Sequence, residues 1–237
     1  MREGSRGTAT TAAWTPEAGF VLAGGRSSRM GRDKALELFC GRPLIEIALE
    51  TFREAGISAA IAGARSDLSG FAPVVEDAER EKGPLAGICA ALSATSAERA
   101  VFLSVDLPLL PASLISCMIG HARITGRAVT LCSVNGFVQT FPAVLGRAVL
   151  SSLGRSLRSG QRGCYAAFQG AAEAIGEPIS VLPVELLAQS GQAAHPSALP
   201  PAWWFLNVNS PGDLARAESI ALAFQSSQAA SRPGPIA

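Results

Sequence analysis

The chain of 237 residues is 48% hydrophobic and 16% charged, which excludes a disordered protein and allows one substantial core. Its 20 basic and 19 acidic residues nearly cancel, so no overall field attracts nucleic acid or an anionic membrane. Its five cysteines are scattered and lack a Cys-x-x-Cys spacing, which argues against a disulfide framework or a zinc site.

The distribution of small, polar and apolar residues predicts three regions. Residues 1–17 are rich in Gly, Ser, Thr and Ala and predict a flexible tail, residues 18–224 predict one folded domain, and residues 225–237 predict a polar tail. The first residues contain no apolar run of signal-peptide length, and no stretch approaches 18 uninterrupted apolar residues. These features predict a cytoplasmic location.

Short apolar runs alternate with helical patterns along the chain. Proline and glycine mark several boundaries: Pro43, Pro84 and Pro111 suit first helical turns, and Gly56 suits a stop. Strands are expected at 18–23, 57–63, 71–75, 100–105, 127–132, 137–144 and 204–208, with a short extended piece at 35–39 that ends in a turn at Cys40-Gly41. Helices are expected at 43–55, 84–94, 111–124, 148–159 and from about 210, with a loop at 190–202. This alternation predicts an α/β fold, a single Rossmann-like three-layer α/β/α domain with a mainly parallel sheet.

A glycine-rich basic segment, residues 22–34, directly follows the first expected strand. Gly24 and Gly25 lack Cβ atoms, so that backbone N–H groups can approach a phosphate closely. The segment also contains four cations, Arg26, Arg29, Arg32 and Lys34. Backbone and charge together predict a triphosphate-binding loop that includes Leu22, Ala23, Gly24, Gly25 and Lys34.

Two commoner phosphate motifs do not fit this segment. A Walker loop needs Gly-Lys-Ser/Thr at its end, whereas Gly31 is followed by Arg32 and Asp33. The dinucleotide-binding motif needs Gly-x-Gly-x-x-Gly, and that spacing is absent.

The run Leu-Ala-Gly-Gly, then Ser-Arg-Met-Gly, then Asp-Lys resembles the signature loop of the molybdenum cofactor guanylyltransferases, a family of nucleotidyltransferases of the sugar-nucleotide type. The related molybdopterin cytidylyltransferases usually carry Leu-Ala-Ala-Gly here, so Gly24-Gly25 favours the guanine enzymes. The resemblance covers roughly residues 19–214. It implies that Arg29 and Lys34 contact the phosphates.

Asp106 follows the apolar run that ends at Val105, where a carboxylate could bind Mg²⁺ beyond the end of a buried strand. By itself, an aspartate before Leu107-Pro108 is also an ordinary turn residue. The segment resembles the Asp-x-Pro step that holds Mg²⁺ in the family, and the resemblance therefore implies that Asp106 is a catalytic metal ligand.

Asp77 and the run Gly-Pro-Leu-Ala-Gly at 83–87 resemble the family segment that lines the base and ribose of the nucleotide. The resemblance implies nucleotide contacts for Asp77 and Gly87. Without the run, Asp77 would be read as a solvated carboxylate in a charged loop.

The segment 205–214 resembles the family's closing Asn-x-Asn-Thr-Pro-Glu-Asp-Leu element, with Ser210 and Gly212 as departures. It implies Asn209 as a second metal ligand and Asn207 as an acceptor contact, although Asn-Ser-Pro is also an ordinary helix cap. Arg155 and Arg162 are further candidates for binding the acceptor's phosphate, although surface arginines are usually just solvated.

The resemblance implies that GMP passes from Mg-GTP to the terminal phosphate of molybdenum-molybdopterin, with molybdoenzyme apoproteins or other cofactor-biosynthesis proteins as further partners. Neither His121 nor His195 belongs to a recognisable catalytic triad or metal-binding pattern. Two other functions stay open: a cytidylyl- or other nucleotidyltransferase, and a nucleotide-binding accessory protein without turnover.

Overall fold

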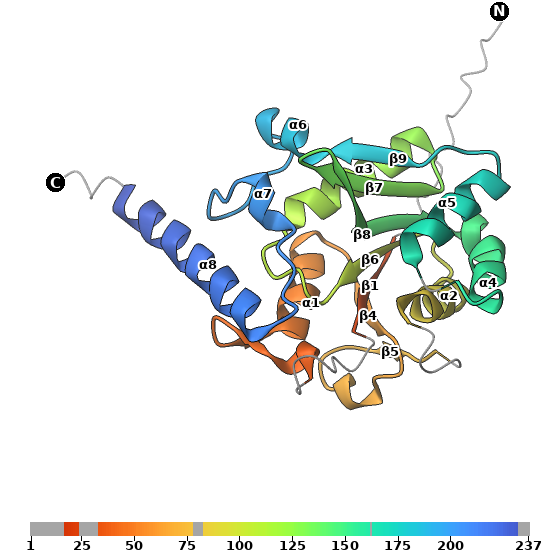
Figure 1. Cartoon of the computed structure of the whole chain (residues 1–237), viewed down its shortest axis with the longest axis horizontal. Helices are drawn as coiled ribbons and strands as arrows, with labels where there is room; N and C mark the ends of the chain where they lie inside the picture. The colour runs from red at the N-terminus through yellow and green to blue at the C-terminus, as the bar shows by residue number, and fades with distance from the viewer. Residues whose placement is uncertain (1–16, 24–32, 78–82, 162, 232–237) are drawn as a thin grey trace, which may run out of the picture.

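The computed structural model describes residues 17–23, 33–77, 83–161 and 163–231, without the side chains of 227–231. These residues form a seven-stranded sheet in the order β5-β4-β1-β6-β8-β7-β9, together with a two-stranded ribbon of β2 and β3 (Figure 1). The strands are β1 (Ala18–Leu22), β2 (Leu38–Phe39), β3 (Arg42–Pro43), β4 (Ala59–Ala62), β5 (Val74–Val75), β6 (Arg99–Ser104), β7 (Val129–Val134), β8 (Phe137–Gly146) and β9 (Ser180–Pro183).

The sheet is mainly parallel, as the alternation of strands and helices predicts. β1 pairs in parallel with β4 and β6, β4 with β5, and β7 with β9. β8 is antiparallel to both β6 and β7. A turn at Asn135 and Gly136, both with positive φ, joins β7 directly to β8, and this connection explains the reversal.

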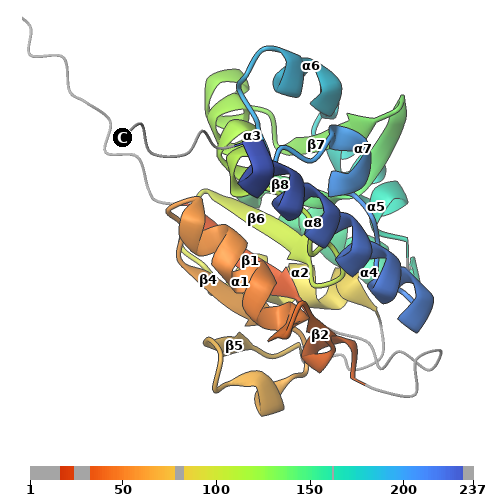
Figure 2. The same ribbon diagram turned by 90° about the vertical axis from the view of Figure 1, so that its left-hand side faces the viewer.

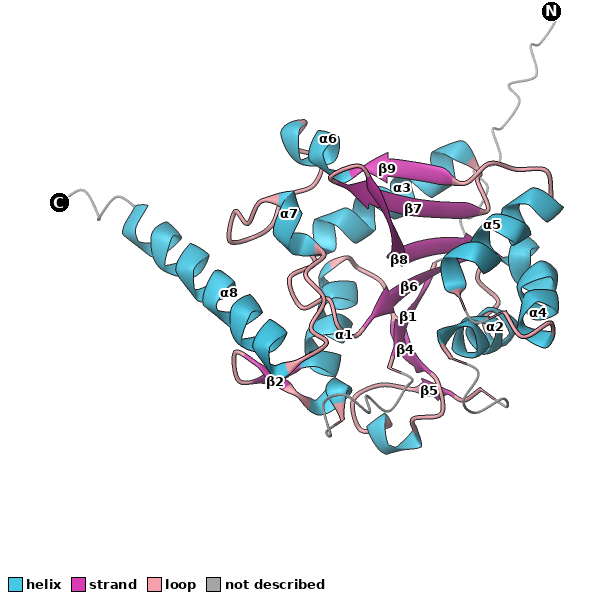
Figure 3. Cartoon of the chain, in the orientation of Figure 1, coloured by secondary structure: helices cyan, strands magenta, loops and turns pink. Residues whose placement is uncertain are grey.

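Helices cover both faces of the sheet (Figure 3). They are α1 (Leu44–Glu54), α2 (Pro84–Ala94), α3 (Ala112–Thr125), α4 (Leu150–Arg158), α5 (Cys164–Ala174), α6 (Val184–Gln189), α7 (Pro201–Trp204) and α8 (Pro211–Ser231). α1, α3, α6, α7 and α8 contribute to one buried cluster, and α2, α4 and α5 contribute to a second. The protein is therefore a three-layer α/β/α fold.

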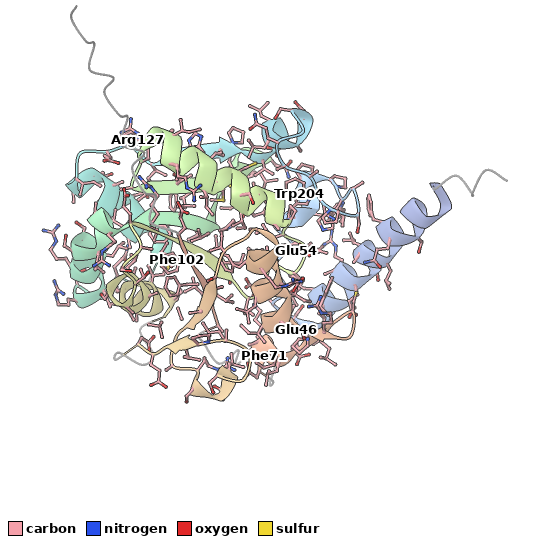
Figure 4. The ribbon with its side chains drawn as sticks, turned by 180° about the vertical axis from the view of Figure 1, so that it is seen from behind. Glu46, Glu54, Phe71, Phe102, Arg127 and Trp204 are labelled. Atoms are coloured by element: carbon pink, nitrogen blue, oxygen red, sulfur yellow. The ribbon has the colours of Figure 1, made fainter. Side chains whose placement is uncertain are left out.

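The alternation of side chains along the strands separates the two clusters. In β1, Val21 belongs to the first cluster, and Phe20 and Leu22 belong to the second. Phe20 stacks on Phe102 of β6 with the ring centroids 5.5 Å apart. Figure 4 shows Phe102 inside the layered body and Trp204 between that body and α8.

The expected strand at 204–208 and the assignment of 190–202 as loop throughout are wrong. The expected strand at 204–208 is absent: α7 ends at Trp204, and 206–209 is a loop. The Pro200-Pro201 pair starts this short helix inside the expected loop 190–202. The indole Nε1 of Trp204 donates to the carbonyl of Leu199 at 2.7 Å. α8 continues to Ser231, so its helical residues include the first part of the expected tail at 225–237.

The sequence did not predict α5, β9 or α6, which fill the stretch between α4 and the loop before α7. The β2–β3 ribbon turns at Cys40 and Gly41, which both have positive φ. The backbone amide of Cys40 donates to the Glu218 carboxylate of α8 at 2.7 Å. α8 consequently begins beside the ribbon and extends away from the sheet (Figures 1 and 2).

Candidate functional site

The parallel strands β1, β4, β5 and β6 all end at one edge of the sheet, and most of the candidate residues follow these ends. Leu22 is the last residue of β1, and its carbonyl accepts a hydrogen bond from the Val105 amide at 3.3 Å. Ala23 follows and is buried. Ligands in open α/β sheets bind beyond this kind of edge, so the strands bring the candidate segments to a suitable place.

Lys34 is held by a short helical turn, Lys34–Leu36, so the expected extended piece at 35–39 is wrong at its start, and the strand β2 begins only at Leu38. The Oδ1 atom of Asp33 accepts a hydrogen bond from the Ala35 amide at 3.1 Å and caps this turn. Ala35 is buried, which fixes the turn against the core. The cap and the buried Ala35 therefore fix the backbone of Lys34, from which its long and flexible side chain extends.

Asp106 lies just beyond β6, where the sequence places it. The amide of Val208 donates to the Asp106 carbonyl at 3.0 Å, which joins this loop to the segment that precedes α8. The side chain of Asp106 is 16% exposed, and its Oδ1 atom is buried without a hydrogen-bond partner among the described residues.

Asn209 is fixed by the first turn of α8. The backbone amide of Asn209 donates to Asp213 Oδ2 at 3.1 Å. The hydroxyl of Ser210 accepts from the Asp213 amide at 3.2 Å and donates to Asp213 Oδ2 at 2.8 Å. This is a capping box in which Ser210 is the cap and Pro211 is the first helical residue. The hydrogen bond from Ser210 lowers the pKa of the Asp213 carboxyl.

The ammonium of Lys34 lies between these two segments. Its Nζ donates to Asp106 Oδ2 at 2.8 Å and to Asn209 Oδ1 at 2.7 Å. The side chains of Lys34 and Asp106 are only 15% and 16% exposed, so their attraction is less screened than that of a surface pair. The structure thus brings together three of the predicted residues, from chain positions 34, 106 and 209.

The donor set agrees with the hard oxygen ligands that Mg²⁺ takes. Asp106 offers a carboxylate oxygen, Oδ1, that none of the described residues satisfies, and Asn209 offers an amide oxygen. Mg²⁺ usually binds one or two carboxylates and keeps waters or substrate phosphates as its other ligands. The described residues contain no group of three or more His, Cys, Asp or Glu side chains able to hold a metal alone, so a substrate-assisted site is the kind that fits.

Arg65 is a residue of this region that the sequence analysis missed. It lies beyond the end of β4, and its Nη1 donates to the carbonyl of Ala23 at 3.0 Å. Its Nη2 donates to Asp33 Oδ2 at 2.5 Å, and Asp67 accepts from Nε and Nη2 at 2.9 and 2.8 Å. Hydrogen bonding to Asp67, with the charges of Asp33 and Asp67, raises the pKa of Arg65. An Arg-x-Asp pair just after a buried strand was the available signal.

Asp77 and Gly87 lie near the same edge. Asp77 is half-buried and comes two residues after β5. Gly87 is buried in α2, and a Cβ atom there would lie 3.5 Å from the backbone of Ala62 at the end of β4. A Cβ atom at this position would therefore make an ordinary van der Waals contact with the end of β4. Whether either residue contacts a nucleotide stays a prediction.

The two acceptor candidates among the described residues, Arg155 and Asn207, make hydrogen bonds outside the Lys34 group. Arg155 lies on α4, where Nη2 donates to Ser152 Oγ at 2.8 Å. Asn207 is exposed, and its amide donates to the carbonyl of Phe205 at 3.3 Å. Several other candidates lie outside the described residues, namely Gly24, Gly25, Arg29 and Arg162.

A separate depression of about 480 Å³ lies at the opposite edge of the sheet and is lined by residues that include Glu17, Ser58 and Arg123. It contains none of the candidate residues. In the described part of the chain, no helix combines the length and the apolarity needed to cross a bilayer.

The chain is similar to known proteins. The family model of the MobA-like NTP transferase domain matches residues 19–175. A molybdenum cofactor guanylyltransferase of Xanthomonas euvesicatoria is 42% identical over 46% of this chain and 56% of its own length. A probable molybdenum cofactor guanylyltransferase of Haloferax mediterranei is 30% identical over 84% of this chain and 92% of its own length.

The fold also has solved counterparts. The crystal structure of molybdopterin-guanine dinucleotide biosynthesis protein A from Archaeoglobus fulgidus matches 87% of this chain and 99% of its own, with a TM-score of 0.69 and 22% identity. A nucleotidyl transferase from Methanothermobacter thermautotroptrophicus matches 90% of this chain with a TM-score of 0.65 and 17% identity. The family-model match and the Haloferax relative together establish that the chain belongs to the MobA-like NTP transferase family.

Proposed function

We propose that the protein transfers GMP from Mg-GTP to the terminal phosphate of molybdenum-molybdopterin, with release of pyrophosphate. The observation that carries this proposal is the contact of the Lys34 ammonium with both Asp106 and Asn209. This contact places a cation from the glycine-rich segment beside two oxygen atoms of the kind that bind Mg²⁺. Such a group suits a triphosphate that carries magnesium. The names of the Xanthomonas and Haloferax relatives support the choice of guanylyl transfer.

The chemistry requires little acid or base catalysis. An oxygen of the acceptor phosphate attacks the α-phosphorus of GTP, a new P–O bond forms, and the bond to the bridging oxygen breaks with its electrons going to pyrophosphate. The nucleophile is already an anion, so no general base is needed. His121 bonds to Ser180 Oγ at 2.7 Å and His195 Nδ1 accepts from the Ser197 amide at 3.0 Å, contacts that leave both outside the Lys34 group.

Positioning and neutralisation of charge are therefore the protein's main tasks. Lys34 places a cation at the triphosphate, and Asp106 and Asn209 keep its ammonium at the end of β6. Asp106, through the Oδ1 atom that accepts no hydrogen bond from the described residues, and Asn209 would hold Mg²⁺. The bound metal supplies charge neutralisation at the phosphate oxygens.

The other assignments stay predictions of this proposal. The segment 22–25 and Arg29 bind the phosphates, Asp77 and Gly87 contact the nucleoside, and Arg155, Arg162 and Asn207 bind the acceptor. Molybdoenzyme apoproteins or other cofactor-biosynthesis proteins as partners, and a cytoplasmic location, also stay predictions.

Two measurements test the proposal. In thermal-shift titrations with GTP, CTP, UTP and ATP in the presence of Mg²⁺, we expect GTP to raise the melting temperature most, because only ligands of the native state stabilise it. With molybdenum-molybdopterin present, Mg-GTP is expected to release pyrophosphate and yield the guanine dinucleotide. Stabilisation by CTP alone would indicate cytidylyl transfer, and GTP binding without pyrophosphate release would indicate an accessory protein.

A further inference from the structure

Arg65 connects the two chain segments that flank residues 24–32. Nη1 donates to the carbonyl of Ala23, on the N-terminal side, and Nη2 donates to the carboxylate of Asp33, on the C-terminal side. The two contacts span 42 and 32 positions of sequence, so they are tertiary contacts and not local loop structure. One guanidinium thus bonds to both ends of the glycine-rich segment.

The contact with Asp33 reaches the Lys34 backbone in one further step. Asp33 uses Oδ2 for Arg65 and Oδ1 for the Ala35 amide, so its carboxylate joins the guanidinium to the turn Lys34–Leu36. A shift of Asp33 would move this turn and would carry the Lys34 ammonium away from Asp106 and Asn209. The place of the cation therefore depends on the place of Arg65.

Asp67 fixes the orientation of Arg65. It accepts from Nε and Nη2, the fork geometry of a bidentate arginine–carboxylate pair. This leaves Nη1 directed at Ala23 and the rest of Nη2 at Asp33. Three acceptors are met by one rigid plane, which a lysine ammonium on a flexible stem cannot reproduce.

The burial of the group gives these contacts weight. The Arg65 side chain is 14% exposed, whereas Asp33 and Asp67 are 38% and 56% exposed. Ala23 is buried, so loss of the guanidinium would leave its carbonyl without that donor in a place with little water. Loss of an arginine from an exposed arginine–carboxylate pair would leave no buried carbonyl without a donor and would cost little.

We propose that Arg65 is a positioning residue that sets the separation of Ala23 and Asp33 and thereby places the Lys34 ammonium on the triphosphate. Asp67 acts through Arg65 by orienting its guanidinium. This inference rests on the proposed nucleotidyl transfer, because it assigns Arg65 a part in that reaction without a contact to the reacting atoms.

The test compares Arg65→Lys, Arg65→Ala and Asp67→Asn with Arg53→Lys. Arg53 is an exposed arginine on α1 that pairs with Glu50, so Arg53→Lys is a matched change of an arginine–carboxylate pair away from the site. We expect Arg65→Lys to lower kcat/KM for GTP by roughly 10- to 100-fold, since a displacement of about 1 Å can cost this much. Asp67→Asn should lower it less, and Arg53→Lys should match the wild type.

A second readout separates positioning from general damage to the fold. Added guanidinium ion, at millimolar concentration, should restore part of the Arg65→Ala turnover, and ammonium ion should not. Wild-type kinetics in Arg65→Lys would overturn the inference, and so would Arg65→Ala activity that neither ion changes. If Arg65→Ala does not fold, full activity in Asp67→Asn overturns it. A wild-type protein that does not turn over GTP would contradict the proposed function instead.

Discussion

The backbone amide of Val208 donates to the carbonyl oxygen of Asp106 at 3.0 Å. This bond aligns the loop after β6 with the segment before α8, and the next residue, Asn209, consequently reaches Lys34. The oxygen atoms around the ammonium thus come from two parts of the chain that lie far apart in sequence. Several consequences of this convergence can be measured.

Asn209→Ala should reduce turnover without preventing folding. Lys34 would lose one of the two oxygen acceptors that the described residues offer it, and we expect kcat/KM for GTP to fall by roughly 10- to 100-fold, as misplacement of a catalytic group can cost. The matched control is Gln169→Ala, which removes an exposed amide from α5. Steady-state pyrophosphate release checks the result, and equal rates in the two variants would contradict it.

Asp106→Asn should remove most of the effect of magnesium on GTP binding. The substitution keeps the size of the side chain but removes the charge beside Lys34 and one oxygen suited to the metal. Turnover should fall by about 100- to 1000-fold, a range typical for losing one electrostatic contact in the transition state. Thermal shifts with GTP, with and without Mg²⁺, check the binding part, and Glu173→Gln on the exposed face of α5 is the control. A magnesium effect as large as in the wild type would count against the assignment.

Ser210→Ala should weaken the first turn of α8. Loss of a serine cap costs about 1 kcal/mol, which urea unfolding at neutral pH can measure. The Ser210 hydroxyl lowers the pKa of Asp213, so the charged carboxylate stabilises the protein above the ordinary pKa of 3.8, and this stabilisation is lost as pH falls below it. Without the hydroxyl, this pH-dependent stabilisation should become smaller. Turnover should fall as well, since Asn209 is tied to the same cap. Unchanged stability would show that the cap is unimportant.

Gly19→Ala should destabilise the core where β1 meets α1. A Cβ atom at this position would lie 2.8 Å from Cδ1 of Phe52, whose side chain is fully buried. Overpacking of this kind costs roughly 1 to 3 kcal/mol. Gly120→Ala in α3 meets nothing within 4 Å and should instead stabilise the protein by up to about 1 kcal/mol. Unfolding free energies that change in the same direction would contradict the contrast.

His195 should make the protein less stable in mild acid. Burial lowers its pKa from 6.5 to about 4, so the unfolded chain takes up a proton in this interval before the folded chain does. Stability should therefore fall as pH decreases from about 6.5 toward about 4. His195→Gln should reduce the difference between urea unfolding at neutral and at acidic pH. An equal difference in both proteins would contradict this role.

The sequence was sufficient for the parts of the fold that depend on strand polarity and helix boundaries. The buried run before Asp106 and the first strand, which ends at Leu22 and is followed by Ala23, must end at the same edge of a parallel sheet, and they do. Pro84 marks the first turn of α2, as predicted, and Pro43 lies directly before the first turn of α1.

Other features depend on tertiary context that local patterns do not contain. The stretch 204–208 has the composition of a strand, but Pro201 starts the helical turn α7, which includes Trp204. The polar residues after Gln225 suggest a tail, yet no proline interrupts the chain between Pro211 and Pro233, and α8 continues through them.

Arg65 was missed for the same reason. The local Arg-x-Asp pair shows only its bond to Asp67, whereas its other two acceptors, Ala23 and Asp33, are distant in sequence and their contacts cannot be seen in the local segment. Only the parallel pairing of β4 with β1 brings the loop after β4 to the ends of the glycine-rich segment.

The position of Asn209 late in the sequence affects where the protein can be truncated and when its site can form during translation. The match to the family model ends at residue 175, so a clone cut to that boundary would encode Lys34 and Asp106 without their amide partner. During synthesis, the contacts of the Lys34 ammonium with both Asp106 and Asn209 likewise cannot form until the ribosome has passed residue 209.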